Sequence, residues 1–170
     1  NGSAQRTLLD MTRGGMAPGV VGCLEMHGTG TALGDPTESG ALAASHGEDA
    51  RSMPLLVGAA KASVGHSEAS SGQVGLLRLQ QVASSLMASG NAQLRVLNPL
   101  VGERLGAVGA SFALPAQASA LSIGPCGVSW FGYSGTIAHA LLAFASGLGL
   151  RGAEAAREGG EEGRSQQDGS

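Results

Sequence analysis

The sequence predicts an α/β fold with a mixed sheet and flanking helices. Two apolar runs, residues 20–24 and 54–60, have the composition of buried strands, and each leads into a loop with a histidine and then into a helical stretch. Two further runs, 128–131 and 137–144, flank a turn rich in Gly and Ser and predict a β-hairpin. Strands that alternate with helices favour parallel pairing, and the hairpin adds an antiparallel strand.

The first part of the chain predicts a helix, a strand and a second helix. Residues 4–13 carry apolar side chains among polar ones and predict a short helix. The first strand leads into the loop H-G-T-G-T at 27–31. Asp35 and Pro36 then predict a helix start, with Asp35 as the N-cap and Pro36 as the first helical residue, and this helix continues to His46.

The second strand leads into the loop K-A-S-V-G-H-S-E at 61–68. Residues 69–87 then predict a long helix, and because it carries little charge we expect it to be buried between layers. Gly72 and Gly75 predict close packing of this helix against a neighbour. Residues 98–120 contain prolines and several glycines, so we expect little regular structure there.

Length and composition predict one domain with a tail. The chain has 170 residues, of which 42% are hydrophobic, enough for the core of one domain at residues 1–150. Residues 151–170 contain five acids and three bases and almost nothing apolar, so we expect a disordered tail. Cys23 and Cys126 each lie beside an apolar run and are expected to be small buried side chains; a disulfide between them stays open.

Charge and hydropathy exclude several kinds of partner. The formal net charge is −3 without a cluster of Lys or Arg, which argues against nucleic-acid binding. The longest nearly apolar run, residues 137–150, is too short for a membrane span and is interrupted by His139. The N-terminal residues have no signal-peptide pattern, so we expect a cytoplasmic protein, with an organelle left open.

Two histidines, His27 and His66, follow two separate strands in equivalent places. Because the carboxyl ends of parallel strands share one edge of a sheet, where ligands bind, parallel pairing would bring the two imidazoles together. A single histidine in a loop is more often structural or simply exposed, but a pair in equivalent places favours a functional site.

Three kinds of site could contain this pair of histidines. A dinucleotide site is disfavoured because G-T-G-T-A-L-G at 28–34 is one residue longer than the dinucleotide motif. A zinc deaminase is disfavoured because Ser129 stands where the second cysteine of P-C-x-x-C is needed, so we expect no metal site. The third is a pair of neutral imidazoles that stabilise an enolate or oxyanion, with Lys61 and Glu68 setting their tautomers and pKa values.

Three segments support the third chemistry by resemblance. H-G-T-G-T-A-L-G-D-P-T-E at 27–38 resembles the H-G-T-G-T-x-L-G-D-P-x-E motif of β-ketoacyl synthases. K-A-S-V-G-H-S-E-A-S-S-G at 61–72 resembles their K-S-x-x-G-H-x-E-x-A-x-G segment, and V-S-W-F-G-Y-S-G-T-I-A-H at 128–139 resembles their S-S-F-G-F-S-G-T-N-A-H hairpin. The match covers about residues 1–145 and is most similar to ketosynthase domains of modular type I polyketide synthases.

This resemblance implies a thiolase-like fold of two similar α/β halves, of which this chain is the C-terminal half and incomplete without the N-terminal half. It implies an acyltransferase of polyketide or fatty acid biosynthesis that catalyses a decarboxylative Claisen condensation. An acyl group on a cysteine would be extended by malonyl on acyl carrier protein. No cofactor would bind directly, because the phosphopantetheine arm belongs to the carrier protein, and the complete enzyme would be a homodimer.

The resemblance also implies roles for single residues. His27 and His66 would promote decarboxylation and hold the thioester oxygen, with Lys61 supporting His66 and Glu68 organising the local hydrogen bonds. The hydroxyls of Thr29 and Thr31 would contact the phosphopantetheine arm. Phe131 would gate the substrate pocket, with its backbone near the oxyanion hole, and Gly132 beside it would also bind substrate.

The chain also departs from the family pattern. The nucleophilic cysteine of the family lies in the N-terminal half, and neither Cys23 nor Cys126 aligns with it. Ile137 replaces an Asn, Ala62 a Ser and Ser70 an Ala. A non-catalytic assembly subunit, or a relative that only decarboxylates, therefore remains the alternative hypothesis.

Overall fold

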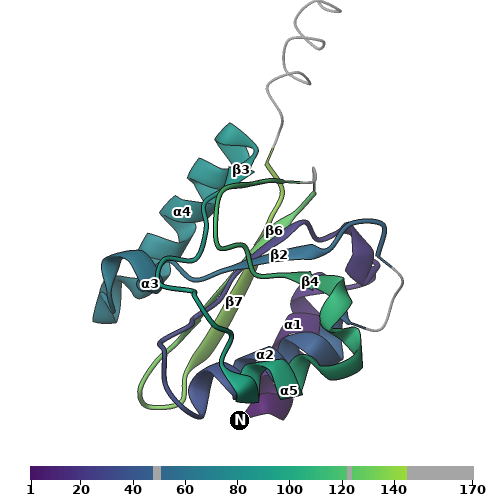
Figure 1. Cartoon of the computed structure of the whole chain (residues 1–170). Coiled ribbons are helices and arrows are strands. Elements are labelled where there is room, and N and C mark those ends of the chain that lie inside the picture. Colours follow the sequence, from purple (N-terminus) through teal and green to yellow (C-terminus); the bar gives the residue numbers. More distant parts are fainter. Residues whose placement is uncertain (48–50, 122–123, 145–170) are drawn as a thin grey trace, which may run out of the picture.

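A central five-stranded sheet organises the chain in the computed structural model, which describes residues 1–47, 51–121 and 124–144 (Figure 1). The strand order is β4-β2-β1-β6-β7, and a separate two-stranded sheet pairs β3 with β5. The strands are β1 (Cys23–Glu25), β2 (Leu55–Gly58), β3 (Met87–Ala88), β4 (Phe112–Ala113), β5 (Ser119–Ala120), β6 (Cys126–Phe131) and β7 (Ile137–Leu142).

Four strands of the large sheet are parallel and one is antiparallel. β4, β2, β1 and β6 pair in parallel, and β7 runs back along β6 as an antiparallel hairpin. The predicted mixed sheet is therefore confirmed. In the centre, Cys23 of β1 lies opposite Leu56 of β2 and Cys126 of β6. Both cysteines are buried and free, so the disulfide left open by the sequence does not form.

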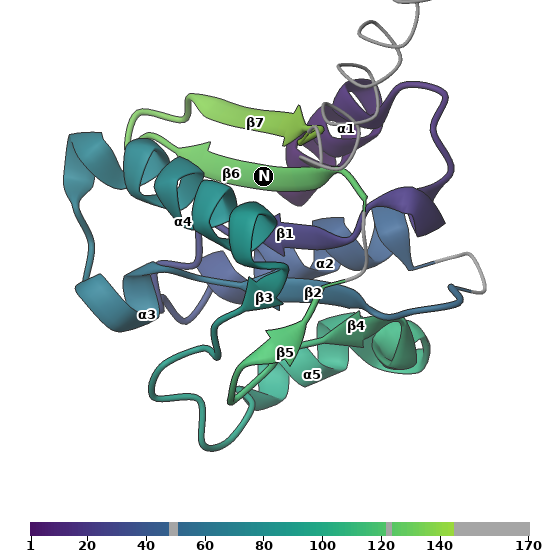
Figure 2. The ribbon, with the colours of Figure 1, turned by 90° about the horizontal axis from the view of Figure 1, so that it is seen from above.

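Helices cover both faces of the sheet, which makes three layers (Figure 2). Helices α1, α2 and α5 pack on one face, and α4 packs on the other against β6. The helices are α1 (Gly2–Arg13), α2 (Gly34–His46), α3 (Lys61–Val64), α4 (Ser71–Ser85) and α5 (Pro99–Leu105), with 3₁₀ helices η1 (Pro18–Val20), η2 (Glu68–Ser70) and η3 (Gly106–Ser111).

Alternate strand residues build two separate cores. Leu24 and Leu55 face the helix layer that contains Leu9, Leu42 and Leu105. On the opposite face, a second cluster gathers side chains from three strands and from α4, namely Cys23, Leu56, Leu79, Val82, Cys126 and Val128. Period-two alternation along the strands thus divides the apolar side chains between two helix layers.

Packing of α4 against β6 depends on small residues, as the sequence predicts. A Cβ added at Gly72 would lie 3.1 Å from the ring of Trp130, and one at Gly75 would lie 2.9 Å from Val128 Cγ2. The helix starts at Ser71, two residues after the predicted start, because Glu68–Ser70 forms a 3₁₀ turn.

Three expectations for local structure are wrong. Asp35 is not the N-cap, since α2 begins at Gly34; its Oδ1 instead accepts a hydrogen bond from Gly30 N at 3.1 Å. Val20 lies in a 3₁₀ helix, so the first strand is limited to Cys23–Glu25. The stretch 98–120 is not structureless, because it holds α5, η3, β4 and β5, whose short lengths give no clear sequence period.

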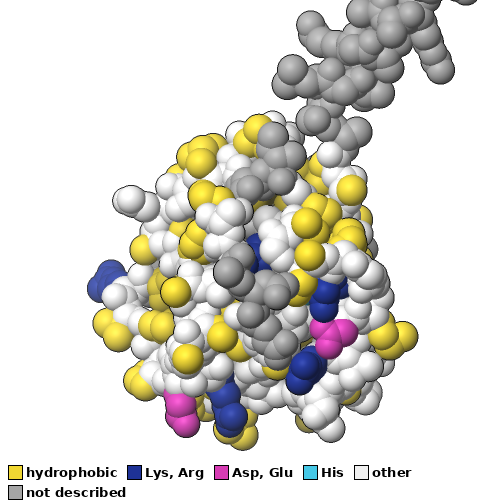
Figure 3. Space-filling model, turned by 90° about the vertical axis from the view of Figure 1, so that its right-hand side faces the viewer, with side chains coloured by type: hydrophobic (Ala, Val, Ile, Leu, Met, Phe, Trp, Pro, Cys, Tyr) yellow, Lys and Arg dark blue, Asp and Glu magenta, His cyan; other side chains and the backbone are white. Residues whose placement is uncertain are grey.

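Charges are sparse on the described surface. On the face seen in Figure 3, basic side chains are few and some lie next to acidic ones. No helix among the described residues has both the length and the apolar character needed to span a bilayer. The predicted tail at 151–170 and the end of the predicted domain lie outside the described residues.

Candidate functional site

The ends of β1 and β2 bring the two predicted histidines together. β1 and β2 are parallel, and their last paired residues are Glu25 and Gly58. His27 and His66 follow these strands, and their ring centroids are 5.8 Å apart with an interplanar angle of 89°. The two imidazoles therefore lie edge to face at one edge of the sheet, as parallel pairing requires.

Backbone contacts fix the tautomer of His27. Its Nδ1 accepts a hydrogen bond from the Phe131 backbone N–H at 3.3 Å. Because an accepting ring nitrogen carries no proton, the proton of the neutral ring is on Nε2. The Phe131 ring centroid lies 5.1 Å from that of His27, so the hairpin contributes both a hydrogen bond and an aromatic wall.

The same logic applies to His66. Its Nδ1 accepts a hydrogen bond from the Glu68 backbone N–H at 2.8 Å, and Ser71 Oγ lies 3.3 Å from the same atom. Its Nε2 therefore also carries the proton. Glu68 contacts His66 through its backbone N–H, and Glu68 itself is exposed.

His27 is neutral at physiological pH. Burial, and then the positive charges of Lys61 and His66, lower the pKa of His27 from 6.5 to about 4. Burial also lowers the pKa of Lys61, while the charge of Glu25 opposes that shift. Lys61 therefore acts on the site through its charge.

A glycine-rich loop carries the predicted threonines. Thr31 Oγ1 accepts a hydrogen bond from Gly34 N at 3.1 Å and lies 3.4 Å from Thr29 Oγ1. Thr29 lines a cavity of about 540 Å³ that Lys61 and His66 also line. Gly132 donates its N–H to Thr136 O at 2.7 Å and closes the hairpin turn beside Phe131.

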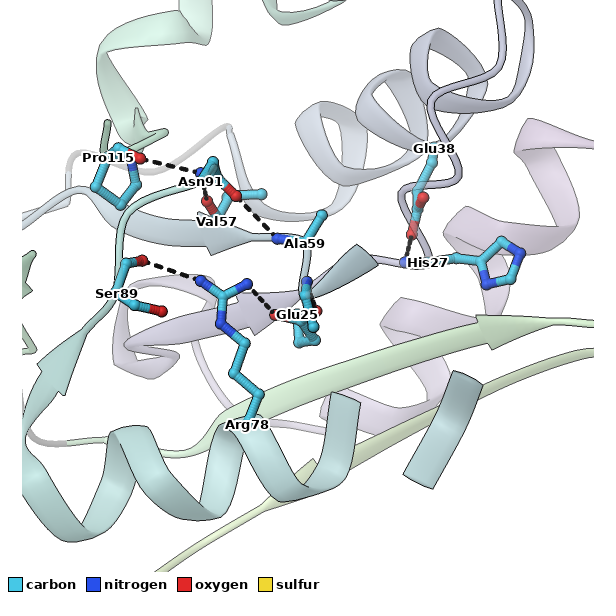
Figure 4. A network of polar contacts seen from close by, with 10 residues as sticks. Glu25, His27, Glu38, Val57, Ala59, Arg78, Ser89, Asn91 and Pro115 are labelled. Atoms are coloured by element: carbon cyan, nitrogen blue, oxygen red, sulfur yellow. Dashed lines mark hydrogen bonds and ion pairs between the residues drawn. The ribbon is translucent and has the colours of Figure 1, made fainter. Parts of the chain in front are cut away.

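Glu38 has a structural role that sequence reasoning missed. Its carboxylate oxygens accept hydrogen bonds from His27 N at 2.8 Å and Gly28 N at 3.0 Å (Figure 4). Burial raises the pKa of Glu38 from 4.5 to about 7 despite these bonds. The sequence signal that could have identified this role is the glutamate of the D-P-T-E segment, eleven residues after His27.

In the described part of the chain, the two histidines are not joined by enough further ligands to form a metal site. Within the described ranges, no group of three or more His, Cys, Asp or Glu side chains could hold a metal ion.

Comparison with protein families gives one clear match. Residues 1–93 match the family described as beta-ketoacyl synthase, C-terminal domain. The chain is 33% identical over 144 residues to erythronolide synthase EryA2 of Saccharopolyspora erythraea and 37% identical over 149 residues to polyketide synthase GfsE of Streptomyces halstedii. Each alignment covers 84% of this chain and 4% of the relative, so the chain spans a small part of these proteins.

Solved structures agree with these relatives. The oxazolomycin ketosynthase domain OzmH KS7 of Streptomyces albus superimposes with a TM-score of 0.75 and 28% identity, over 86% of this chain and 27% of that one. The ketosynthase from module 6 of the bacillaene synthase of Bacillus subtilis gives a TM-score of 0.75 at 25% identity, over the same shares. Both the fold and the sequence motifs are thus those of a ketosynthase, and the chain belongs to the β-ketoacyl synthase family as a thiolase-like C-terminal domain.

Proposed function

We propose that this chain supplies the histidine half of a ketosynthase that condenses an acyl thioester with malonyl on acyl carrier protein. The observation that carries the proposal is the pair of imidazoles, 5.8 Å apart, at the carboxyl edge of two parallel strands. Each Nδ1 accepts a backbone N–H, which leaves both Nε2–H groups as donors.

The two donors suit a decarboxylation. The malonyl carboxylate leaves as carbon dioxide, and the electron pair of the broken C–C bond moves into the thioester to form an enolate. The imidazole N–H groups of His27 and His66 would donate to the enolate oxygen, where negative charge develops. The enolate carbon would then attack the acyl thioester and displace the cysteine thiolate of the N-terminal half.

Neutrality of His27 supports this role. With a pKa of about 4, His27 remains a neutral hydrogen-bond donor at pH 7 and does not compete as a proton donor that would quench the enolate. The charge of Lys61 would favour the carboxylate and the enolate in the same cavity. Glu68 would orient His66 through its backbone N–H.

The cavity beside His66 suits a phosphopantetheine arm. Such an arm has two amides and a branched apolar segment, and the 540 Å³ cavity combines polar groups such as Thr29 and Asn91 with apolar ones such as Val57 and Leu94. Thr29 lines this cavity and would contact the arm. Thr31, Phe131 and Gly132 do not line it, and for them the contact with the arm rests on the family resemblance alone. No cofactor of the chain's own is needed for this step.

We further propose three partners. An N-terminal ketosynthase half would provide the nucleophilic cysteine, since Cys23 and Cys126 are buried within the sheet. Acyl carrier protein would deliver the malonyl group. The complete enzyme would be a homodimer that works in the cytoplasm.

Carbon dioxide release tests the proposal. The chain is joined to a complete N-terminal ketosynthase half, and release from malonyl carrier protein is measured for the wild type, His27→Ala and His66→Ala. Removing one donor is expected to raise the barrier by about 3–4 kcal/mol and to slow release by roughly 10²–10³-fold. His27→Gln and His66→Gln retain an N–H donor near the lost Nε2 and should recover part of the rate.

A control separates this effect from general damage. Met11 on α1 is 74% exposed, and Met11→Ala should leave release unchanged. If both histidine-to-alanine variants release carbon dioxide at the wild-type rate, the chain acts instead as a non-catalytic assembly subunit.

A further inference from the structure

A cluster of three polar side chains lies where the two histidine loops separate. At the ends of β1 and β2, a backbone hydrogen bond joins Met26 N to Gly58 O at 2.8 Å. Beyond it, one segment continues to His27 and the other to α3 and His66. The next two amides after β2, Ala59 N and Ala60 N, donate to side chains rather than to the neighbouring strand.

Glu25 and Arg78 form one part of this cluster (Figure 4). Glu25 is 3% exposed, and its Oε1 accepts the hydrogen bond from Ala60 N. Its Oε2 pairs with Arg78 Nη1 at 2.9 Å, and Arg78 Nη2 donates to Ser89 O at 2.9 Å. A buried carboxylate at the end of β1 is thus joined to the exit of β2 and to α4.

Asn91 forms the other part. Its Oδ1 accepts from Ala59 N at 2.9 Å, and its Nδ2 lies 3.0 Å from Val57 O and 3.3 Å from Pro115 O. One side chain therefore satisfies two backbone groups at the end of β2 and joins them to the chain after β4. In the view of Figure 4, Asn91 approaches the strand ends from above and Arg78 approaches them from α4 below.

The two loops touch at the residues that this cluster fixes. Gly28 has φ of 45°, and a Cβ added there would lie 2.7 Å from Ala59 Cβ. A shift of Ala59 would therefore move the loop that carries His27. Ala60 directly precedes Lys61 and α3, so a shift of Ala60 would move the segment that carries His66.

We propose that Glu25, Arg78 and Asn91 are positioning residues that set the separation of the His27 and His66 imidazoles. This inference rests on the proposed function for its effect on rate. Reacting groups held in a productive geometry lose about 10²-fold in rate when they are misplaced by about 1 Å, even by a change remote from the chemistry. Glu25 and Arg78 do not line the cavity beside His66. Asn91 does line it, but its Oδ1 and Nδ2 already bond to backbone groups, so its effect would come through the backbone that it holds.

Two charge-neutral changes test the cluster. The double variant Glu25→Gln with Arg78→Met removes one negative and one positive charge together, so no unpaired charge remains buried. Asn91→Leu keeps the shape of the side chain and removes its three hydrogen bonds. Leu105→Ala, at a buried core position on α5, is the control for lost stability.

The first measurement needs no turnover. The pKa of His27 is followed by NMR titration of the labelled imidazole in the chain joined to an N-terminal half. In both test variants we expect the pKa of His27 to rise toward 6.5, because a displaced ring is less buried and lies farther from Lys61, whereas Leu105→Ala should leave it unchanged.

The second measurement is decarboxylation by the chain joined to an N-terminal half. Both test variants should lose about 10- to 100-fold in kcat with KM within about threefold, while Leu105→Ala should keep its kcat within about threefold. A wild-type kcat, or an unmoved His27 pKa, in both test variants would overturn the inference. If the joined wild type releases no carbon dioxide, the proposed function fails, and the titration alone still decides whether the cluster positions the rings.

Discussion

At the scale of single residues, the site depends on backbone amides that hold polar side chains. Each imidazole accepts one backbone N–H, from Phe131 or from Glu68, and therefore presents its other nitrogen as a donor. The histidine loop itself is held by Glu38, whose two oxygens satisfy two consecutive amides. Donor geometry at the site is thus determined by groups that do not take part in the reaction.

Substitution of Glu38 should therefore destabilise the loop. Glu38→Ala leaves the amides of His27 and Gly28 without acceptors, and we expect a loss of about 1–3 kcal/mol in the free energy of unfolding. Glu38→Gln keeps one acceptor oxygen and should lose less. Urea denaturation at pH 7 measures the free energy of unfolding of the wild type and of both variants. Equal values for the three proteins would show that the Glu38 carboxylate does not stabilise the loop.

His46 should make the stability of the chain depend on pH. It is 2% exposed, and burial together with the charges of Arg13 and Arg51 lowers its pKa from 6.5 to about 4. Between these values the unfolded chain binds the proton and the folded chain does not, so the contribution of His46 to stability rises with pH from 4 to 6.5 and is constant above. Acidification from pH 6.5 to pH 4 therefore lowers the free energy of unfolding by about 3 kcal/mol through His46.

Acid unfolding followed by circular dichroism tests this dependence. His46→Gln cannot take up the proton, so its unfolding midpoint should lie at lower pH than that of the wild type. Coincident acid transitions for the two proteins would show that His46 does not carry the effect.

At the scale of elements, α4 has one buried face and one exposed face. Leu79 and Val82 pack in the core between α4 and the sheet. Leu76 and Leu77 are 44% and 64% exposed on the other side of the helix. The low charge of this helix therefore has two causes: one apolar face packs on the sheet, and the other is left open within the described chain.

Two leucines two positions apart should therefore behave differently. Leu79→Ala creates a cavity and should lower the free energy of unfolding by about 2–5 kcal/mol. Leu77→Lys should change it by less than about 0.5 kcal/mol and should reduce self-association. Denaturation and analytical ultracentrifugation measure the two effects, and similar losses for both variants would mean that the exposed face is covered in solution.

At the scale of the whole molecule, the described chain exposes many large apolar side chains. They include Val64, Leu76, Leu77, Leu86 and Met87, which lie on or next to α3 and α4. Large exposed apolar side chains concentrated on neighbouring elements are typical of an interface. In the proposed enzyme the N-terminal half would cover it.

We therefore expect the chain alone to be poorly stable. Its thermal transition should be broad and should depend on protein concentration, and a dye that binds apolar surface should bind the chain more strongly than the joined protein. A sharp transition of a monomer for residues 1–150 alone would contradict this expectation.

The sequence by itself determined the parts that rest on local patterns. Apolar runs followed by glycine-rich loops predict β1, β2 and their histidines, and the turn at 132–136 predicts the β6–β7 hairpin. Parallel strand order then makes His27 and His66 neighbours. These predictions hold because period, turn residues and strand polarity act over a few residues at a time.

Only the tertiary structure decided the contacts between distant residues. Glu25 pairs with Arg78 across 53 positions, and Asn91 reaches Ala59 across 32. The two-residue strands β4 and β5 exist because neighbouring backbone pairs with them, which no local pattern of the stretch 98–120 indicates. A polar side chain in a sequence has many possible partners, and folding selects one by burying both away from water.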